Sequence, residues 1–340
     1  MSGPEVPARQ SASIRDVARI AGVSRQTVSR VINSHPSLRP ETRDRVQAVI
    51  DQLRYRPNRA AQALGTNRSQ TIGVLAYQRS QYGPAAAIEG IETAAQAAGY
   101  LVNTTNLTSN TPGAIREALE LQVAHRVDGL AIIAPQTKIL RVIDELAPDL
   151  PYVLLHSRNH DDPHALFVDQ VAGAAAATRH LLALGHRDIY HVAGPQDWIE
   201  AEARMQGYLD AMIDAEAPVA PPILGDWTAD FGYYAGRELV RTCDFTAVFA
   251  ANDQMAIGLL HAFRDAGLKV PGQVSVVGFD DVPEAAHYWP PLTTVQQDFR
   301  RLGRLCVERL LRFGDERISE HGAPIAPVLV VRGSTGPVER

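Results

Sequence analysis

Residues 13–33 read SIRDVARIAGVSRQTVSRVIN, and this stretch decides the N-terminal part of the fold. Ser13 is followed three residues later by Asp16, which is the spacing of a capping box at the start of a helix. Apolar residues then recur at helical spacing until Gly22 interrupts them. Ser24 is the next residue that can cap a helix. The stretch therefore predicts two short helices joined by a tight turn.

A third helix is predicted to begin near Pro40, because proline suits the first helical turn. Its apolar residues recur at helical spacing: Val46, Val49, Ile50 and Leu53. Arg39 occupies the cap position and cannot accept the free backbone N–H groups, so we expect an imperfect start. Two short helices with a tight turn between them, followed by a third helix, are typical of a helix-turn-helix.

The second predicted helix carries polar residues that suit the major groove of DNA. Its apolar positions face inward, which turns four polar residues outward: Arg25, Gln26, Ser29 and Arg30. Arginine can bind guanine through two hydrogen bonds and glutamine can bind adenine in the same way. Ser24 and Thr27 can reach phosphates. The alternative is a small helical bundle with a solvated arginine face.

The charge of the chain is divided unevenly, and this favours the DNA-binding interpretation. The 340 residues sum to −5. Residues 1–68 contain 12 arginines, no lysine and 5 acidic residues, which gives +7, so residues 69–340 carry −12. A basic head can meet a polyanion, whereas an acidic body repels one.

Composition excludes several classes of protein. With 45% hydrophobic residues the chain can form two or three cores, and no apolar run approaches the ~18 residues of a membrane span. The first residues lack the basic and apolar regions of a secretory signal. Cys243 and Cys306 make no disulfide framework and fit a reducing compartment, so we expect a cytoplasmic protein without membrane contact.

From residue 70 onward, apolar strands alternate with helices, which predicts parallel sheets covered on both sides. The predicted strands are 71–77, 100–106, 127–134, 152–157, 188–193, 247–251, 274–279 and 328–331. The predicted helices are 84–98, 111–124, 138–146, 171–184, 201–215, 231–241 and 254–266. Two such sets imply two lobes with a cleft between them, and ligands in such sheets bind outside the carboxyl ends of the strands.

Polar and aromatic residues that suit a sugar lie at these strand ends. Asn252 and Asp280 each follow a strand, Arg204 lies on a helix after another strand, and Trp227 follows a short one. Carboxylates, amides and an arginine bind hydroxyl groups, while an aromatic ring packs on the C–H side of a sugar.

Each of these residues also has a structural interpretation. Asp253 and Asp281, which stand next to two of them, fit helix N-caps better than ligands. Trp227 fits core packing as well as it fits binding, and an arginine on a surface helix is usually solvated.

Longer motifs resemble the LacI/GalR family of bacterial transcriptional regulators. Residues 14–33 are similar to the family's headpiece and residues 55–61 to its hinge helix. In the body, residues 248–258, 274–281 and 290–300 carry the resemblance. It implies a homodimer on a pseudo-palindromic double-stranded DNA operator, with paired hinge helices that open the minor groove.

The resemblance also implies a domain organisation. A flexible arm spans 1–11, the headpiece 12–56, the hinge helix 57–67, and the effector-binding and dimerisation domain 68–340. The fold is then a two-lobed, doubly wound α/β core like that of periplasmic binding proteins, preceded by an all-α helix-turn-helix headpiece. The expected N-lobe takes in 68–165 and 296–325, and the C-lobe 166–295 and 326–335.

Functional residues are carried over from the family pattern to matching positions. The implied DNA contacts are Ser24, Arg25, Gln26, Thr27, Ser29, Arg30, Asn33, Asn58, Arg59, Ala61 and Leu64, with Leu64 as the wedge in the minor groove. The implied effector contacts are His156, Arg204, Trp227, Asn252, Asp280, Gln297 and Phe299. His156 departs from the pattern, because a family sequence that this chain resembles has an aspartate in the pocket there.

These implications predict a repressor controlled by a saccharide, with a galactoside-like or other glycoside as the expected inducer. No cofactor or metal is expected. No leucine heptads follow the last predicted strand, so we expect a dimer and not a tetramer.

Other classes stay open as alternatives. One is a family member with a nucleobase or nucleoside corepressor, and another is a sugar-binding protein that does not regulate DNA. An enzyme is not expected, because the chain contains no G-x-G, G-x-x-x-x-G-K-[ST] or G-x-S-x-G. Asp253 and Asp280 could be mistaken for the carboxylate pair of a glycosidase, and a test for turnover of oligosaccharides would separate the two classes.

Overall fold

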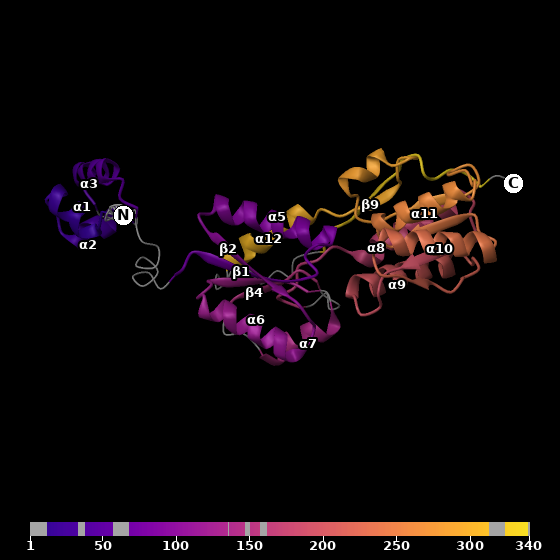
Figure 1. Cartoon of the computed structure of the whole chain (residues 1–340), viewed down its shortest axis with the longest axis horizontal. Helices are drawn as coiled ribbons and strands as arrows, with labels where there is room; N and C mark the ends of the chain where they lie inside the picture. Colours follow the sequence, from indigo (N-terminus) through magenta and orange to yellow (C-terminus); the bar gives the residue numbers. More distant parts are fainter. Residues whose placement is uncertain are drawn as a thin grey trace, which may run out of the picture. The chain divides into compact units, whose positions relative to one another are not determined.

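The structure is a computed structural model that describes residues 12–32, 38–56, 68–134, 136–146, 150–156, 162–312 and 324–338. The chain forms two compact units, Met1–Ser69 and Gln70–Arg340 (Figure 1). The predicted arm over 1–11 and hinge helix over 57–67 lie outside the described residues. So do the predicted DNA contacts Asn33, Asn58, Arg59, Ala61 and Leu64.

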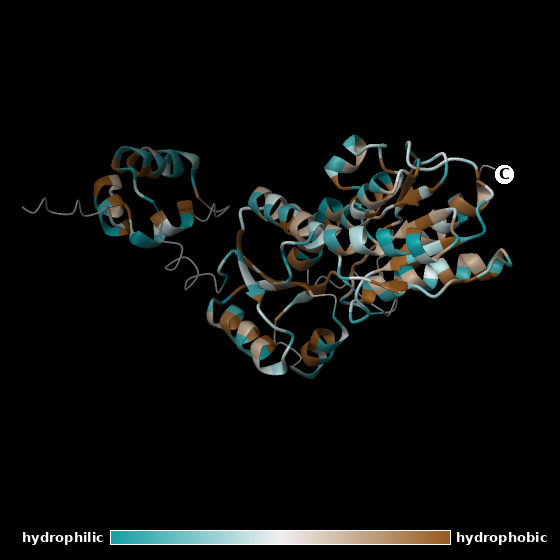
Figure 2. Ribbon diagram, turned by 45° about the vertical axis from the view of Figure 1, so that its right-hand side comes forward, coloured by the Kyte–Doolittle hydropathy of each residue, from teal (hydrophilic) through white to brown (hydrophobic). Residues whose placement is uncertain are grey.

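The described part of the N-terminal unit contains the three predicted helices: α1 (Ile14–Ala21), α2 (Arg25–Ile32) and α3 (Pro40–Leu53). Each helix turns an apolar side inward and a hydrophilic side outward (Figure 2). The inner sides form one small core of Val17, Ala18, Ala21, Val28, Val31, Val46 and Val49.

The ends of these helices follow the predicted capping chemistry. The backbone N–H of Asp16 donates to the side chain of Ser13, and the backbone N–H of Ser13 donates to Asp16, so the capping box forms. Gly22 ends α1 with a φ of 64°, a conformation that glycine adopts easily. Ser24 accepts a backbone N–H at the start of α2. Arg39 makes no side-chain cap for α3, which confirms its imperfect start.

The first sheet of the C-terminal unit is parallel, with strand order β2-β1-β3-β4. Its strands are β1 (Thr71–Tyr77), β2 (Leu101–Leu107), β3 (Gly129–Ile133) and β4 (Tyr152–Leu154). Val74 and Leu75 of β1 are fully buried in different clusters, because successive strand residues point to opposite faces. One face is covered by α5 (Tyr82–Ala97) and α12 (Phe299–Leu311), and the other by α6 (Pro112–Ala124) and α7 (Thr137–Leu146).

The second sheet repeats this plan, with parallel strands in the order β6-β5-β7-β8. Its strands are β5 (Ile189–Ala193), β6 (Ile223–Leu224), β7 (Ala247–Ala250) and β8 (Ser275–Val277). Helices α8 (Gln170–Ala183) and α9 (Ile199–Asp214) pack on one face, and α10 (Ala229–Thr242) and α11 (Asp253–Asp265) on the other (Figure 1). The two lobes of a doubly wound α/β domain are therefore confirmed.

The chain passes between the two lobes more than once. After β8 and the short 3-10 helix η1 (Pro283–His287) it forms β9 (Thr294–Gln296), and then returns to the first lobe as α12, which packs on α5. It comes back as β10 (Val328–Val330), which pairs with β9 in antiparallel orientation. Counting the passage from β4 to α8, the chain crosses between the lobes three times, and Val168 and Ile325 of two crossings form a β-bridge.

The strands and helices predicted within the described residues are all present, with ends displaced by a few residues. The helix predicted from residue 84 begins at Tyr82, and the strand predicted to residue 157 ends at Leu154. The sequence reading did not identify α12 as a helix or 294–296 as a strand. In the described ranges no helix is long and apolar enough to span a bilayer.

Candidate functional site

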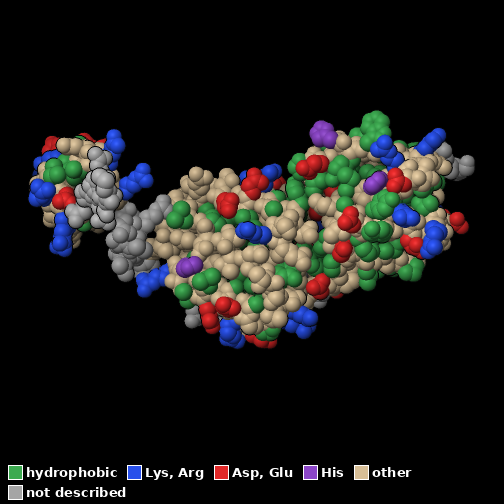
Figure 3. Space-filling model, viewed as in Figure 1, with side chains coloured by type: hydrophobic (Ala, Val, Ile, Leu, Met, Phe, Trp, Pro, Cys, Tyr) green, Lys and Arg blue, Asp and Glu red, His purple; other side chains and the backbone are tan. Residues whose placement is uncertain are grey.

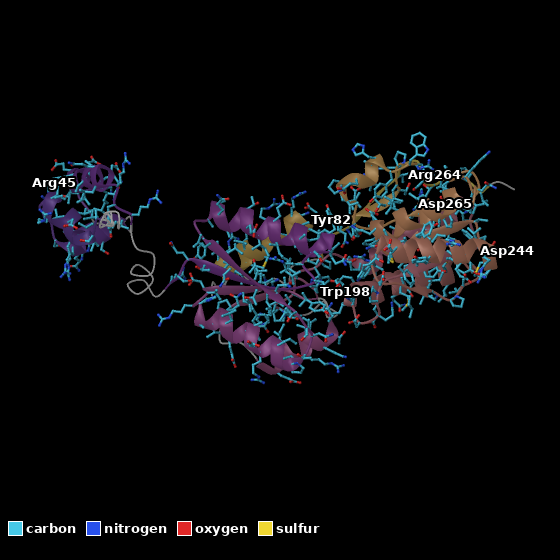
Figure 4. The ribbon with its side chains drawn as sticks, in the orientation of Figure 1. Arg45, Tyr82, Trp198, Asp244, Arg264 and Asp265 are labelled. Carbon is cyan, nitrogen blue, oxygen red and sulfur yellow. The ribbon has the colours of Figure 1, made fainter. Side chains whose placement is uncertain are left out.

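A cavity lies between the two sheets, at the carboxyl ends of their strands. Tyr82 and Trp198 mark its position, since both are labelled where the first lobe meets the second (Figure 4). Of the seven predicted effector contacts, six line this cavity: His156, Arg204, Trp227, Asn252, Asp280 and Phe299. Gln297 does not line it and lies behind Asp280. The structure thus brings together residues that are up to 143 positions apart, from His156 to Phe299.

Arg204 on α9 is the central cation of the cavity. Its Nη2 lies 3.5 Å from Oδ1 of Asp280, and the two side chains are only 6% and 10% exposed. Its Nε donates to Gln170 at 2.9 Å, and its Nη1 donates to the carbonyl of Ala251. The guanidinium also stacks 4.1 Å from the ring of Phe279. Every nitrogen of the guanidinium is thus engaged, which fixes the direction of the fork.

Asp280 follows β8 in a backbone conformation that few non-glycine residues adopt, with a φ of 112°. This conformation directs its carboxylate toward Arg204, and Nε2 of Gln297 donates to the same Oδ1 at 2.6 Å. Burial raises the pKa of Asp280 to about 6, while Arg204 and Gln297 oppose the rise. The carboxylate is therefore ionised at neutral pH but close to titration.

Asn252 caps α11 and also faces the cavity. Its Oδ1 accepts the backbone N–H of Met255 at 2.9 Å, and its Nδ2 donates to the carbonyl of Trp227 at 3.0 Å. The expectation that Asp253 and Asp281 act as helix caps was wrong. Asp253 is the first residue inside α11, and no helix begins at Asp281.

Asp253 is instead a buried support for the loop that carries Asp280. Its carboxylate accepts the hydroxyl of Thr294 at 2.6 Å and the backbone N–H of Val282 at 2.9 Å. Burial and the nearby Asp280 raise the pKa of Asp253 to about 8. Asp281 pairs with Arg332 at 2.6 Å, which ties the same loop to the C-terminal segment.

Trp227 forms an aromatic wall of the cavity in the second lobe. Its backbone has a φ of 75°, and its ring lies edge-on to Trp198, with centroids 5.4 Å apart. A Cβ at Gly194 would overlap this ring, so glycine there makes room for the indole. The Nε1 of Trp227 is buried without a hydrogen-bond partner among the described residues.

Phe299 and Tyr82 form a second aromatic wall, in the first lobe. They come from the first residues of α12 and α5, and their rings meet edge-on with centroids 5.9 Å apart. Gly83 leaves space for the ring of Phe299, since a Cβ there would lie 2.9 Å from it. Polar groups on one lobe and aromatic rings on both suit a ligand with hydroxyl groups and an apolar ring face.

His156 bridges the two lobes by direct contact with a residue that the sequence reading missed. It follows β4 in the first lobe, and its Nδ1 contacts Oε1 of Glu200 in the first turn of α9. Burial and the charge of Arg204 lower the pKa of His156 to about 3, so the ring is neutral at pH 7. A neutral ring in this contact donates from Nδ1 to the carboxylate.

Several cavity residues were not predicted from the sequence, among them four polar or aromatic side chains: Tyr82, Gln170, Trp198 and Glu200. All four lie at or just before the start of a helix that follows a strand end or a crossing between the lobes. That position is the signal that was available, because helices of doubly wound sheets begin at the ligand-binding edge.

The second predicted site is the outer face of α2, which belongs to the other unit. Val28 and Val31 are buried, as predicted. Arg25, Gln26 and Arg30 are exposed, together with Ser24 before the helix, while Thr27 and Ser29 are half-buried. Figure 3 shows arginine side chains projecting from the surface of this unit. Three exposed polar side chains on one helix match the demands of base contact in a major groove.

Within the described residues, no three His, Cys, Asp or Glu side chains are grouped so that they could hold a metal ion.

Family models match both the part of the chain that carries the α2 face and the part that carries the cavity. Residues 13–58 match the family model of bacterial regulatory proteins of the lacI family, and residues 178–335 match that of a periplasmic binding protein-like domain. The lactose operon repressor of Escherichia coli (strain K12) is 32% identical over 325 residues, which are 95% of this chain and 90% of that protein. The ribose operon repressor of the same strain is 33% identical over 329 residues, 95% of this chain and 99% of that one.

The fold comparison agrees. A crystal structure of the lac repressor dimer, bound to operator and the anti-inducer ONPF, matches with a TM-score of 0.88 at 32% identity. The match covers 96% of this chain and all of that one. A helix-turn-helix unit joined to a two-lobed binding domain defines a transcriptional regulator under effector control. The chain belongs to the lacI family of bacterial regulatory proteins.

Proposed function

We propose that this protein is a homodimeric repressor that binds a specific DNA operator and responds to a saccharide in the cavity between its lobes. The single observation that carries the saccharide proposal is the buried Arg204–Asp280 pair, 3.5 Å apart, placed between aromatic walls. Adjacent hydroxyl groups of a sugar fit a carboxylate beside a guanidinium, and the C–H face of the ring fits Trp227 or Phe299. A galactoside-like or other glycoside is the expected inducer.

The DNA-binding proposal rests on the charge and exposure of α2. Arg25, Gln26 and Arg30 would contact base edges, with Ser24, Thr27 and Ser29 as the remaining headpiece contacts. We extend the proposed interface to Asn33 and to the hinge residues Asn58, Arg59, Ala61 and Leu64 on the basis of the family pattern. The acidic body contributes no attraction to phosphate, so affinity should fall steeply with salt, by roughly 0.9 log units per phosphate contact for each log unit of salt.

The two sites are coupled in our proposal through the angle between the lobes. A saccharide that favours one lobe angle changes the position of the hinge segments and weakens DNA binding. Such coupling is reciprocal, so the operator must weaken saccharide binding by the same factor. The protein would act in the bacterial cytoplasm, as a regulator and not as an enzyme.

A thermal-shift screen of the full chain tests the effector class. Mono- and disaccharides and free nucleobases are the probes, since a ligand that binds the folded state raises the melting temperature. We expect a saccharide to raise it in the wild type and in the control Asp244→Asn, and not in Asp280→Asn. Asp244 is exposed at the far end of the second lobe (Figure 4). A shift with nucleobases alone would replace the saccharide proposal by the corepressor alternative.

The DNA part is tested separately, with duplexes selected from a random library and measured by fluorescence anisotropy. The saccharide found above should lower the affinity for the selected duplex. Leu64→Ala should weaken binding to that duplex more than binding to a scrambled one. A saccharide that binds without any effect on DNA affinity would contradict the coupling.

A further inference from the structure

We propose that Glu200, together with His156, is a selectivity device that accepts the hydroxyl groups of a neutral saccharide and rejects phosphorylated or carboxylated sugars. The inference rests on the proposed function and adds the charge class of the effector to it. It concerns a part of the cavity separate from the Arg204–Asp280 pair.

The two residues come from different lobes and meet at the seam of the cavity. His156 follows β4, while Glu200 lies in the first turn of α9. Each side chain is 13% exposed. A second contact crosses the same seam just before α9 begins, where the backbones of Gln136 and Trp198 form a β-bridge. The pair therefore lies where both lobes can touch one ligand.

Each member of the pair offers one unused acceptor. Nδ1 of His156 and Oε1 of Glu200 are engaged with each other, whereas Nε2 and Oε2 are buried and have no hydrogen-bond partner among the described residues. In the neutral imidazole that donates from Nδ1, Nε2 carries a lone pair, and Oε2 of a carboxylate also accepts. Buried polar atoms in native proteins nearly always have partners. Nε2 of His156 and Oε2 of Glu200 can therefore each accept a hydrogen bond from a ligand, and saccharide hydroxyls are suitable donors.

The charge of the cavity excludes an anionic ligand. Among the described residues that line it, Arg204 is the only arginine or lysine, and Asp169, Glu200 and Asp280 are acidic. The charge of the guanidinium is already paired with Asp280, so Arg204 is not a free counter-charge for a phosphate, although its remaining N–H groups can still donate to hydroxyls. A buried anion without a counter-charge is strongly disfavoured.

Glu200 and Arg204 lie close enough together on α9 to contact one ligand. Glu200 and Arg204 are four residues apart, so they share a face of the helix and are separated by about 6 Å along its axis. Both line the cavity. Glu200 also lies at the positive end of the helix dipole, which favours its ionised form. A saccharide on Arg204 and Asp280 would therefore extend toward the acceptors of the His156–Glu200 pair.

The test uses isothermal titration of the full chain with matched sugars: glucose and galactose, their 6-phosphates, their uronic acids, and neutral disaccharides built from them. In the wild type, neutral sugars should bind and their anionic counterparts should bind at least tenfold more weakly. Glu200→Gln should lower the affinity for the neutral sugar about tenfold or more. It should also reduce the difference in affinity between neutral and anionic sugars. Glu202→Gln is the matched control, because Glu202 is exposed on the same helix and does not line the cavity.

A second variant keeps the test independent of folding defects. His156→Asn retains an N–H donor that can face Glu200 and removes the part of the ring that carries Nε2, so it should weaken neutral sugars severalfold, and the melting temperature of the free protein checks that the variant folds. Tighter binding of a sugar phosphate or uronate in the wild type would overturn the proposal. So would affinity within twofold of wild type in both variants. If instead no sugar binds in a way that Asp280→Asn abolishes, the proposed function itself fails.

Discussion

The guanidinium of Arg204 and the carboxylate of Asp280 form an ion pair across 3.5 Å, in a part of the second lobe where both side chains are almost fully buried. The pair joins α9 to the loop after β8, two elements that are far apart in the sequence. Its orientation depends on Gln170 and Gln297, which bond to the two partners and to each other. The two glutamines therefore hold in place the ion pair that faces the cavity.

Removal of one partner should cost more stability than removal of both. Arg204→Met leaves Asp280 buried without its cation, and breaking a buried pair in this way costs about 3–5 kcal/mol. The double variant Arg204→Met/Asp280→Asn should recover part of this loss. Urea unfolding followed by tryptophan fluorescence measures it in the C-terminal unit alone, because Trp198, Trp227 and Trp289 all belong to that unit.

The control for this measurement is Arg237→Met, which removes an exposed arginine from α10 of the same lobe. It should change the free energy of unfolding by less than about 0.5 kcal/mol. Equal losses in the single and the double variant would show that Arg204 acts through packing, not through its pairing with Asp280.

The stability of the C-terminal unit should fall as pH rises from 5 to 7, partly because of Asp253. The pKa of this carboxyl is about 8 in the folded chain against 3.8 for an ordinary aspartate. Between these two values the folded state binds the proton that the unfolded state has lost, so stability declines with rising pH by up to about 1.4 kcal/mol per pH unit. Asp253→Asn should abolish this share of the slope, because an amide keeps an acceptor for Val282 and a donor for Thr294.

Urea unfolding at pH 5, 6 and 7 provides the measurement. Asp244→Asn, at an exposed position, should retain the wild-type slope. If Asp253→Asn and the wild type lose stability in parallel, Asp253 is ionised in the folded protein throughout this range.

Gly194→Ala should disturb the aromatic wall of the cavity. The added Cβ would overlap the ring of Trp227, so the indole has to move, and overpacking of this kind costs about 1–3 kcal/mol. The displaced ring should also shift the emission spectrum and weaken the binding of any saccharide that stacks on it.

Gly113→Ala is the matched control. A Cβ there meets nothing within 4 Å at the start of α6, so stability should stay the same or rise by up to about 1 kcal/mol. An unchanged spectrum and affinity in Gly194→Ala would show that Trp227 does not depend on this space.

Local signals were sufficient to predict the helix-turn-helix and most of the α/β body. The capping box at Ser13 and the stop at Gly22 are short-range features, and the buried strands are continuous apolar runs. Helix α12 was missed although Leu302, Cys306, Val307 and Leu310 lie at helical spacing. Four arginines interrupt that stripe, and the partner that stabilises it, α5, lies about 200 residues earlier.

The candidate site was predictable where it follows strand ends and unpredictable where it depends on contact between lobes. Asn252 and Asp280 follow β7 and β8, so the topology alone places them at one edge. The contact of His156 with Glu200 depends on how the two lobes close on each other, which no local pattern encodes. The positive φ of Trp227 is likewise a result of tertiary packing, because a bulky residue does not favour that conformation.

Arg30→Ala tests the proposed DNA face most directly. Arg30 is exposed in the last turn of α2, whereas its neighbour Val31 is buried and holds the helix in place. Loss of an arginine that reads one base should weaken binding to a selected duplex by about 1–3 kcal/mol and relax the preference at one base position. Anisotropy titrations with single-base variants of that duplex measure both effects. Arg237→Ala removes the same charge from the C-terminal unit and should leave affinity and preference unchanged. A uniform loss across all duplexes in Arg30→Ala, with a shallower salt dependence, would instead assign Arg30 to a phosphate.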